Sequence, residues 1–390
     1  MSVSPGSILL FLLVFSAVYY GLFIARAYRG LRSLPDLRES APSRTVTVLI
    51  PARNEEATIG RCLDALIRQD YPQDKIEFLV IDDGSTDRTA AIVSEYRRRD
   101  GRVNIVQLGP DTTIRPSRKR GRKPEALAAG IARSRSDIII TTDSDCLPSA
   151  SWVRVLTSYL RDGVVYAVGP VLERPGHSFF TRLRALEVLG LIAITAGRIG
   201  IGKPVNGHGG NTAFFREVYE KTGGFDLKAV KSDEETLMHE TLSHGIGAVG
   251  FAATPLATVY TSSPPTFANY WNQRLRWGSM HGRFRSRTIL LELMLLYCSL
   301  LFPLVTLLAT FRIPELLPAL LGSFLLKVLT DLSILRLAGV KFGQGFSLIT
   351  FVVGELLHSS FIVAVSTVAQ ILPYRWKDRK VLAVDSRRRS

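Results

Sequence analysis

Long apolar runs lie at both ends of the chain, and a segment of mixed hydrophobic and polar residues lies between them. The first run covers residues 8–24 and is followed at once by Arg26, Arg29 and Arg32, with no Lys or Arg before it. About 20 apolar helical residues cross a hydrocarbon core of about 30 Å, and cytosolic flanks carry an excess of basic residues. The pattern predicts a spanning helix whose C-terminal end lies in the cytosol. A cleaved signal peptide is the alternative, but this stretch lacks the basic start and small-residue cleavage site of such peptides.

Three later apolar runs cover residues 289–310, 314–335 and 346–372. Each is long enough to cross a membrane as a helix. Three crossings after a cytosolic domain would place the basic C-terminal tail outside, against the positive-inside tendency. We therefore expect one run to lie in the membrane interface or to re-enter. The last run is the first candidate because it contains Glu355 and His358.

The middle of the chain alternates aliphatic, β-branched runs with helical patterns. Predicted strands cover residues 45–51, 77–81, 103–108 and 137–142, and predicted helices cover residues 57–69, 89–98 and 125–132. This alternation predicts a mostly parallel α/β sheet covered on both faces. Ligands bind such sheets at the carboxyl edge, where the acidic turns 82–85 and 143–145 fall.

These patterns divide the chain into five expected segments: an N-terminal transmembrane helix (1–30), a cytosolic domain (45–265), an interfacial helix (266–287), two or three transmembrane helices (288–372) and a basic tail (373–390). The interfacial assignment rests on aromatic and arginine residues typical of helices at a membrane surface, including Trp271, Trp277 and Phe284. We expect an integral protein of the cell or inner membrane with its central domain in the cytosol.

The formal net charge of +15 raises the possibility of a nucleic-acid-binding protein. Zinc-finger spacing is absent from the sequence, however, and the basic tail follows an apolar run, so attraction to anionic membrane lipids explains the charge more simply. We expect membrane lipids, and no nucleic acid, as partners. A second basic cluster at residues 115–123 is either a solvated loop or an edge that faces a diphosphate. The three cysteines are too scattered for a disulfide framework, which fits a reducing compartment.

Asp143 and Asp145 are the strongest candidate metal ligands. Two carboxylates this close repel each other, and a divalent cation shared with a diphosphate would relieve that repulsion. An acidic turn after a strand is common, so the triplet alone is weak evidence, but its place at the sheet edge favours a metal site.

Several motifs in a fixed order carry a resemblance to a known family: VLIPARNEE (48–56), QDYP (69–72), IDDGSTD (81–87), KPEALAAGI (123–131), TDSD (142–145), GGNTAFFR (209–216), SDEETL (232–237) and QRLRW (273–277). The chain resembles the membrane-bound family 2 glycosyltransferases, which include cellulose, hyaluronan and poly-N-acetylglucosamine synthases and ceramide glucosyltransferases. The resemblance implies a GT-A type doubly wound mixed sheet with flanking transmembrane helices. It also implies a nucleotide-sugar donor, a Mn²⁺ or Mg²⁺ ion, and a lipid or polysaccharide acceptor.

The family pattern also implies roles for individual residues. Those that would hold the donor, which the resemblance implies is a UDP-sugar, lie in the first half of the domain: Pro51, Glu55, Asp83, Ser85, Lys123 and Asp143, with Asp143 and Asp145 supporting the metal ion. Those on the interfacial helix would contact the diphosphate and border the acceptor: Gln273, Arg276 and Trp277. Purely structural readings stay open for Pro51 and Gly84 as turn-shaping residues and for Trp277 as a membrane anchor.

The general base falls in Ser232-Asp233-Glu234-Glu235. Aligning Leu237 with the family's apolar position after the base assigns the role to Glu234, whereas the family uses Asp, which keeps Asp233 as the alternative. For either residue, the structural alternative is an acid in the first turn of a helix, where its negative charge stabilises the helix N-terminus. One base without a carboxylate nucleophile implies a single displacement with inversion at the anomeric carbon. A polyprenyl-phosphate sugar synthase and a catalytically dead regulatory membrane protein are the competing functions.

Overall fold

The computed structural model describes residues 4–109, 123–205, 207–225, 234–264, 266–278 and 287–372, together with the backbone of 374–376 and 379–381. Its centre is a seven-stranded sheet made of β3 (Val103–Gln107), β2 (Ile76–Asp82), β1 (Val46–Ala52), β4 (Ile138–Thr142), β8 (Asn211–Phe215), β6 (Val164–Val168) and β9 (Ala248–Phe251), in that order. Strand β8 runs antiparallel to both of its neighbours, and the other pairs are parallel. The expected mixed α/β sheet is confirmed.

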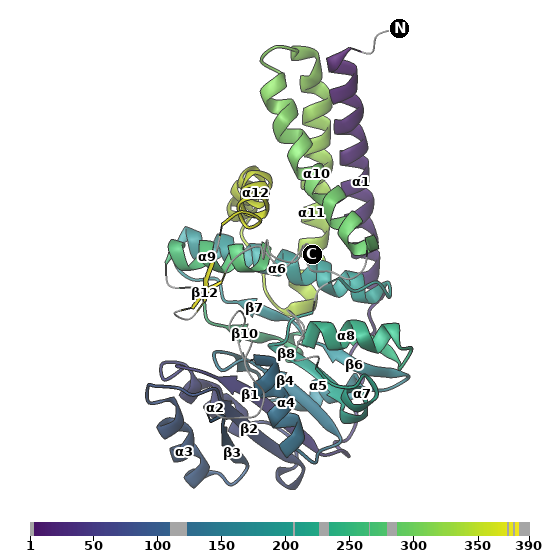
Figure 1. Cartoon of the computed structure of the whole chain (residues 1–390). Coiled ribbons are helices and arrows are strands. Elements are labelled where there is room, and N and C mark those ends of the chain that lie inside the picture. The colour runs from purple at the N-terminus through teal and green to yellow at the C-terminus, as the bar shows by residue number, and fades with distance from the viewer. Residues whose placement is uncertain are drawn as a thin grey trace, which may run out of the picture.

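Helices cover both faces of this sheet (Figure 1). They are α2 (Ile59–Ile67), α3 (Thr89–Arg99), α4 (Lys123–Arg133), α5 (Trp152–Ser158), α7 (Arg216–Lys221) and α8 (Glu234–Ser243). Alternate residues of a strand point to opposite faces, so Val48 and Ile50 join the core under α2 and α5 whereas Leu49 joins the core under α4. This two-sided burial explains why the strands are almost continuously apolar.

A small second sheet lies between the large sheet and the remaining helices (Figure 1). It consists of β5 (Leu147–Pro148), β10 (Val259–Thr261) and β7 (Val171–Glu173). Short 3₁₀ turns cover Gln73–Lys75, Pro255–Ala257 and Pro314–Leu316, and a hairpin of β11 (Tyr374–Trp376) and β12 (Arg379–Val381) follows the last helix.

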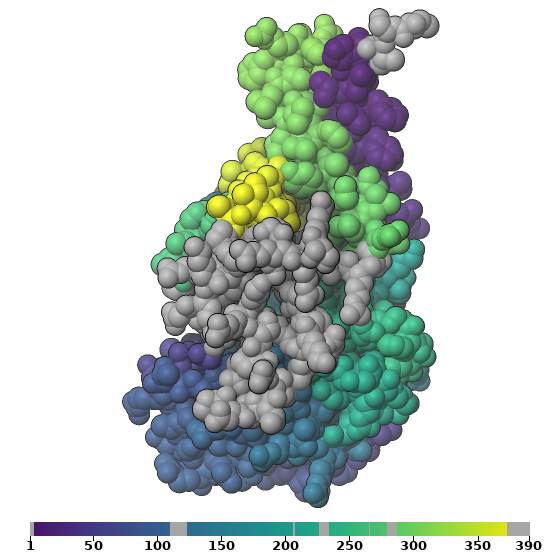
Figure 2. Space-filling view, in the orientation of Figure 1, coloured from purple at the N-terminus to yellow at the C-terminus, as the bar shows by residue number. Residues whose placement is uncertain are grey.

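Three helices project away from the sheets: α1 (Pro5–Ser33), α10 (Arg287–Ala309) and α11 (Leu317–Phe342) (Figures 1 and 2). At their base, α6 (Phe179–Gly200) and α9 (Phe267–Gly278) run across this direction, and α12 (Leu348–Val368) is seen end-on, so it too crosses the projecting helices. Within the described chain, four helical segments are long and apolar enough to cross a membrane: Pro5–Ser33, Arg287–Ala309, Pro314–Phe342 and Leu348–Val368.

Helix α6 joins the projecting helices to the sheet domain through a close backbone contact with α1. A Cβ added at Gly30 of α1 would collide with the carbonyl oxygen of Gly197, and one added at Gly200 would collide with that of Gly30. Only glycine lets two helix backbones approach this closely, as in tightly packed membrane helices. The contact fixes α6 beside the arginine-rich end of α1.

An ionic network lies inside the projecting helices. The Lys327 ammonium lies 2.9 Å from Asp331 in the same helix and 2.5 Å from Glu355 of α12, and the Tyr20 hydroxyl donates to Asp331 at 2.8–2.9 Å. All four residues are buried. The Glu355 carboxylate of α12 is thus paired toward α11, whereas Nδ1 of His358 on the same helix has no hydrogen-bond partner among the described residues.

The structure corrects some predicted boundaries. Within the predicted interfacial segment 266–287, the structure describes the helix α9 at Phe267–Gly278 and the first residue of α10 at Arg287, and residues 279–286 lie outside the described residues. The helix predicted at 314–335 continues to Phe342, where Gly343 adopts a left-handed cap conformation with φ 75°. The long helix α6, inside the predicted domain 45–265, was not identified from the sequence.

Candidate functional site

The carboxyl ends of β1, β2 and β4 meet at one edge of the large sheet. Residue Ala52 pairs with Asp82 at the ends of β1 and β2, and β4 ends at Thr142 just before Asp143. Because these strands are parallel neighbours, the turns that follow them are brought together. The acidic turns predicted as ligand-binding therefore lie at a shared edge.

The turn after β2 is shaped by its own side chains. The amide and the hydroxyl of Ser85 donate to Asp82 Oδ1 at 3.0 and 2.5 Å, and the amide of Asn54 donates to Ser85 Oγ at 3.0 Å. Gly84 has φ 69°, a left-handed conformation that favours glycine. In this structure Ser85 and Gly84 form the turn, which matches the structural reading for Gly84.

Asp83, the next residue, is buried beside an arginine that the sequence did not single out. Arg53 Nη1 lies 3.5 Å from Asp83 Oδ2 and donates to the Asp83 carbonyl oxygen at 3.1 Å. Both residues sit in the loops after adjacent strands, so their pairing follows from the parallel register. The carboxylate is held in place for a hydrogen-bonding partner at the sheet edge.

Pro51 and Glu55 belong to the end of β1 and the loop after it. Pro51 pairs with Ile81 of β2. On the other side of β1, the pairing with β4 ends at Leu49, so the N–H that proline lacks costs no hydrogen bond to β4. The Glu55 amide donates to Thr89 Oγ1 and its carboxylate accepts from Thr58 Oγ1, both at 2.8 Å. The first bond ties the loop to the start of α3, and the second ties it to the residue before α2.

Lys123 brings together a predicted metal ligand and the predicted general base. Its Nζ lies 2.8 Å from Asp143 Oδ1 and 3.1 Å from Glu234 Oε1. Burial alone lowers the pKa of Lys123, but the two carboxylates outweigh that effect and raise the pKa above its ordinary value. The lysine therefore carries a positive charge at the point where an anionic donor would enter.

Glu234 is the first residue of α8, and its side chain is only 3% exposed. Its carboxylate packs against the backbone of Gly209, where any Cβ would collide with it, and its carbonyl oxygen accepts from Tyr166 Oη at 2.8 Å. The residue is thus both a first-turn helix acid and a member of the site. Asp233, the alternative base, lies outside the described residues, as does the basic cluster at 115–123 except for Lys123.

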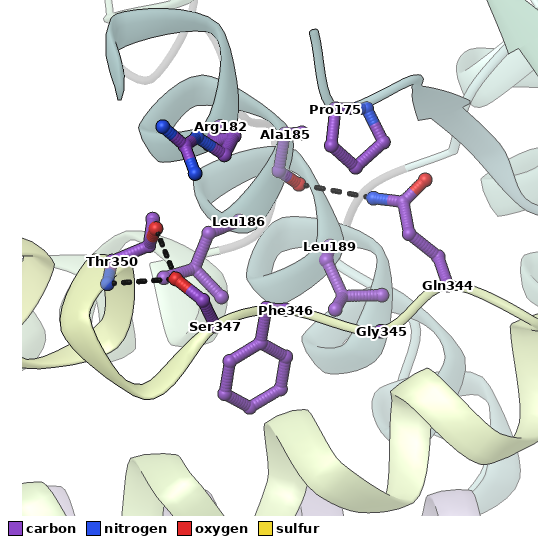
Figure 3. A pocket seen from close by; sticks show the side chains of 10 residues that line it. All are labelled: Pro175, Arg182, Ala185, Leu186, Leu189, Gln344, Gly345, Phe346, Ser347 and Thr350. Carbon is purple, nitrogen blue, oxygen red and sulfur yellow. Dashed lines mark hydrogen bonds between the residues drawn. The ribbon is translucent and has the colours of Figure 1, made fainter. Parts of the chain in front are cut away.

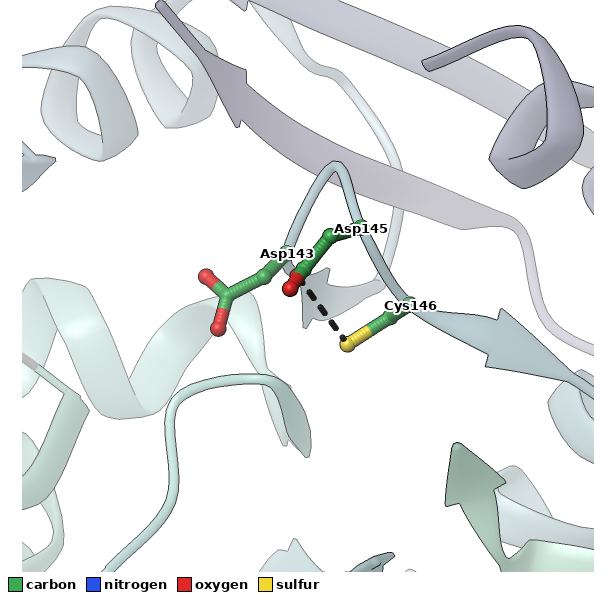
Figure 4. A group of neighbouring side chains, drawn as sticks. All are labelled: Asp143, Asp145 and Cys146. Carbon is green, nitrogen blue, oxygen red and sulfur yellow. Dashed lines mark hydrogen bonds between the residues drawn. The ribbon is translucent and has the colours of Figure 1, made fainter. Parts of the chain in front are cut away.

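Asp143, Asp145 and Cys146 place one potential ligand atom each within 4.8 Å of one another (Figure 4). Burial raises the pKa of Asp145 and the neighbouring Asp143 raises it further, while the hydroxyl of Thr261, 2.8 Å from Asp145 Oδ2, opposes the shift. Such crowding of two acids is relieved by a cation. The chemistry fits Mn²⁺ or Mg²⁺ on the two carboxylates, since hard cations prefer oxygen ligands.

Cys146 is a poor third ligand for such a cation. Burial raises the pKa of its thiol well above the ordinary value, and the two nearby aspartates raise it further. A protonated thiol is a weak ligand, because the thiolate is the form that binds metals. Hard cations such as Mn²⁺ and Mg²⁺ also prefer oxygen to sulfur, so the two aspartates are the stronger candidate ligands.

The predicted diphosphate-binding motif lies on α9 in the layer above the sheet. Its Arg274 forms a bidentate pair with Glu187 of α6 at 2.8 and 2.9 Å, while Tyr270 donates to the same carboxylate at 2.6 Å. The Arg274 guanidinium stacks 4.2 Å from the Trp277 ring centroid and donates to Gln273 Oε1 at 3.0 Å. Gln273 and Trp277 are thus held through Arg274, with Arg276 on the same helix.

The structure assembles only part of the predicted site. Lys123, Asp143 and Glu234 form one ion-paired group, and Asp143 and Asp145 form the acidic pair beside it. Gln273 and Trp277 instead make their described polar and ring contacts within the α6–α9 layer. Contacts such as Thr261 with Asp145, or Glu187 with Arg274, join residues far apart in sequence and left no local pattern to detect.

Comparisons with known proteins agree with this architecture. The profile described as "Glycosyl transferase family 2" matches residues 47–223, and that described as "Glycosyl transferase family group 2" matches residues 138–335. A mannosyltransferase from Pyrobaculum calidifontis, solved in complex with GDP-Man and Mn²⁺, has a similar structure with a TM-score of 0.56 at 21% sequence identity. That likeness covers 86% of this chain and 98% of the other, and it shows a shared fold.

Two curated relatives are similar in sequence. A protein named "Probable glycosyltransferase YdaM", from Bacillus subtilis (strain 168), is 32% identical over 253 residues, covering 63% of this chain and 57% of the relative. A "Beta-monoglucosyldiacylglycerol synthase" from Synechocystis sp. is 28% identical over 243 residues, covering 61% of this chain and 48% of the relative. The matches thus span about half the length of these relatives.

Proposed function

The chain belongs to glycosyl transferase family 2 and has the GT-A fold, and on that basis we propose that it transfers a sugar from a UDP-sugar to a membrane-lipid acceptor with inversion. The geometry of Lys123 between Asp143 and Glu234 is the observation that carries the proposal. It places a candidate metal-binding acid and a candidate base at 2.8 and 3.1 Å from one fixed cation. A lipid acceptor is supported by the candidate membrane helices and by the glycolipid-synthase name of one relative.

The donor would bind along the carboxyl edge of the sheet. Asp83 would meet the base of the nucleotide, in the loop pair that Arg53 holds, and Pro51, Glu55 and Ser85 would shape the surrounding walls. Asp143 and Asp145 would hold Mn²⁺ or Mg²⁺, which supplies positive charge to the diphosphate as it becomes the leaving group. Lys123 adds a second fixed positive charge beside the same carboxylates.

Glu234 is the proposed general base, with Asp233 as the alternative. A base must be ionised to accept the acceptor's proton, and the ammonium 3.1 Å away favours the ionised carboxylate. With one such acid and no carboxylate nucleophile assigned, the acceptor oxygen would attack the anomeric carbon directly. The bond to the diphosphate then breaks on the opposite side, which inverts the configuration.

The helix α9 would close the site. Arg276 would neutralise charge on the diphosphate, since guanidinium groups bind phosphate oxygens through paired hydrogen bonds. Gln273 and Trp277 would border the acceptor, with their positions set by Arg274 and Glu187. Exclusion of water by this helix would favour transfer over hydrolysis of the donor.

We propose that α1, α10 and α11 cross the membrane and that α12 lies in the interface. The end-on orientation of α12 relative to the other three helices supports this assignment. Two crossings after the domain return the chain to the side of Arg26, Arg29 and Arg32. The catalytic domain and the basic tail then share the cytosolic side, as the positive-inside tendency favours.

Proteoliposomes of the full chain test the proposal. We expect a UDP-hexose in a panel of UDP-sugars to give a sugar-labelled lipid, only with Mn²⁺ or Mg²⁺ present, and NMR of the product to show an inverted anomeric centre. A product released by mild acid would instead indicate a polyprenyl-phosphate sugar. Absence of both transfer and donor hydrolysis across UDP- and GDP-sugars would support the catalytically dead alternative.

A further inference from the structure

A cavity of about 200 Å³ lies between α6 and the segment that connects α11 to α12 (Figure 3). Its walls are mainly apolar and include Ala185, Leu186 and Leu189 of α6 and Phe346 of the connection. One water takes up about 30 Å³ in the liquid, so the cavity has room for a larger group. Apolar cavities stay dry and accept apolar ligands.

Two polar side chains at this cavity add a chemical preference. Arg182 is exposed, and no carboxylate pairs with its guanidinium among the described residues. Gln344 is only 4% exposed; its Nε2 donates to the Ala185 carbonyl at 3.4 Å, but its Oε1 has no hydrogen-bond partner in the described chain. Buried acceptors are usually paired with a donor. The cavity therefore suits a ligand with an apolar part, an anionic group and a hydrogen-bond donor.

The position of the cavity points to the source of such a ligand. Helix α6 contacts α1 at Gly30, between Arg29 and Arg32, which mark the cytosolic headgroup level in the proposed topology. Helix α12 packs against the same α6 surface, since Gly354 lies beside Leu183 and Leu186. The cavity is thus at the depth where phospholipid headgroups meet their acyl chains.

We propose that this cavity binds one anionic membrane phospholipid, with an acyl chain between Leu186, Leu189 and Phe346 and the phosphate at Arg182. A headgroup hydroxyl or amine would donate to Gln344 Oε1. This lipid is a resident component that joins α6 to the α11–α12 connection, and it is distinct from the acceptor consumed in the reaction. Its binding needs neither the donor nor the metal ion.

Native mass spectrometry tests the proposal on the full chain. The protein is reconstituted in vesicles of phosphatidylglycerol and phosphatidylcholine, extracted in mild detergent and weighed with its retained lipids. We expect one retained phosphatidylglycerol, and roughly tenfold weaker retention in Arg182→Glu, because a charge-assisted bond is lost. Leu186→Trp should also lose the lipid by filling the apolar part. Arg336→Glu makes the same charge change on an exposed residue of α11 outside the cavity and should retain the lipid.

Several outcomes would overturn the proposal. One such outcome is that Arg182→Glu retains as much lipid as the unchanged protein. Because Arg182 is exposed, this variant still decides the question if circular dichroism shows that Leu186→Trp does not fold. Displacement of the lipid by inorganic phosphate alone would show that the acyl chain is not required. Adding donor and Mn²⁺ to the lipid-loaded enzyme separates this proposal from the proposed function: retained phosphatidylglycerol that stays unmodified during turnover supports a resident lipid, and its conversion to a glycosylated lipid would identify it as a substrate.

Discussion

The ammonium of Lys123 and the carboxylate of Glu234 form a 3.1 Å ion pair in which the acid is almost completely buried. The same ammonium pairs with Asp143 at 2.8 Å, so one lysine balances two acids of the candidate site. Replacing Lys123 and replacing Glu234 should therefore affect stability and catalysis differently.

Replacing the lysine separates these consequences. Lys123→Met leaves Glu234 buried without its cation, and an unsatisfied buried polar or charged group costs about 1–3 kcal/mol or more. We expect a lower unfolding temperature in detergent together with a loss of transfer. The double variant Lys123→Met/Glu234→Gln removes the orphaned charge and should recover much of the stability but none of the activity. Equal stability in both variants would mean that the pair contributes little to folding.

The identity of the base is decided by two matched substitutions. Glu234→Gln keeps the size and hydrogen-bonding atoms but removes basicity, so turnover should fall about 100- to 10,000-fold while donor binding survives. A helix-end charge contributes only about 0.3–1 kcal/mol, and its loss would leave turnover nearly intact. If Asp233→Asn is inactive and Glu234→Gln is active, Asp233 is the base. Full activity in both would place the base outside this segment.

Metal dependence is expected to follow the two aspartates and not the cysteine. Asp143→Asn and Asp145→Asn should each weaken Mn²⁺ binding and abolish transfer, because each removes an oxygen ligand from a small donor set. Cys146→Ala should bind Mn²⁺ normally, since this hard cation prefers oxygen to sulfur ligands. Calorimetric titration of Mn²⁺ measures the affinities, and excess chelator should stop the unchanged enzyme. A tenfold or larger loss of affinity in Cys146→Ala would add sulfur to the ligand set.

The pair between Glu187 and Arg274 should control the position of α9. Arg274→Lys keeps the charge but loses the two-point contact, and a hydrogen bond to a charged group contributes about 1.5–3 kcal/mol. We expect lower thermal stability and a turnover loss of roughly tenfold or more, with donor hydrolysis rising relative to transfer as water enters. Arg133→Lys, an arginine-to-lysine change on α4 away from this pair, is the matched control and should leave stability and turnover unchanged. Unchanged kinetics in Arg274→Lys would show that α9 is positioned by other contacts.

Membrane topology is testable with single cysteines. Phe311 lies between α10 and α11 and is 83% exposed, while Arg98 is exposed on α3 of the sheet domain. In a Cys298→Ser background, a membrane-impermeant thiol reagent should label Phe311→Cys in intact cells and Arg98→Cys only after lysis. The native Cys62 and Cys146 are buried and should stay unlabelled in the folded protein. The reverse pattern would invert the proposed orientation.

The sequence predicted the first half of the sheet well because its signals are local. The strands β1 to β4 and the helices between them alternate in short, regular units, and the structure places them within a few residues of the predicted limits. Helix α6 was missed because charged residues interrupt its apolar pattern. Their partners are distant in sequence: Arg184 pairs with Glu173, and Arg198 with Glu292.

The candidate site shows the same division. Asp143 and Asp145 could be proposed from their turn alone, since the end of a buried strand marks the binding edge. The contact of Lys123 with Glu234, and the fit of the Glu234 carboxylate against Gly209, depend on how α4, α8 and the segment before β8 pack together. Residue pairs of that kind have no fixed spacing, so only the folded chain identifies them.

The glycine contact between α1 and α6 has a consequence for which acceptors fit. With no side chains between the two backbones, nothing at the crossing can repack to let the domain tilt or rise, so the catalytic edge stands at a constant height above the bilayer. A hydroxyl must then reach that height to react. If the proposed topology and function hold, this fixed height would select acceptors by the length of their headgroups, acting as a ruler perpendicular to the membrane.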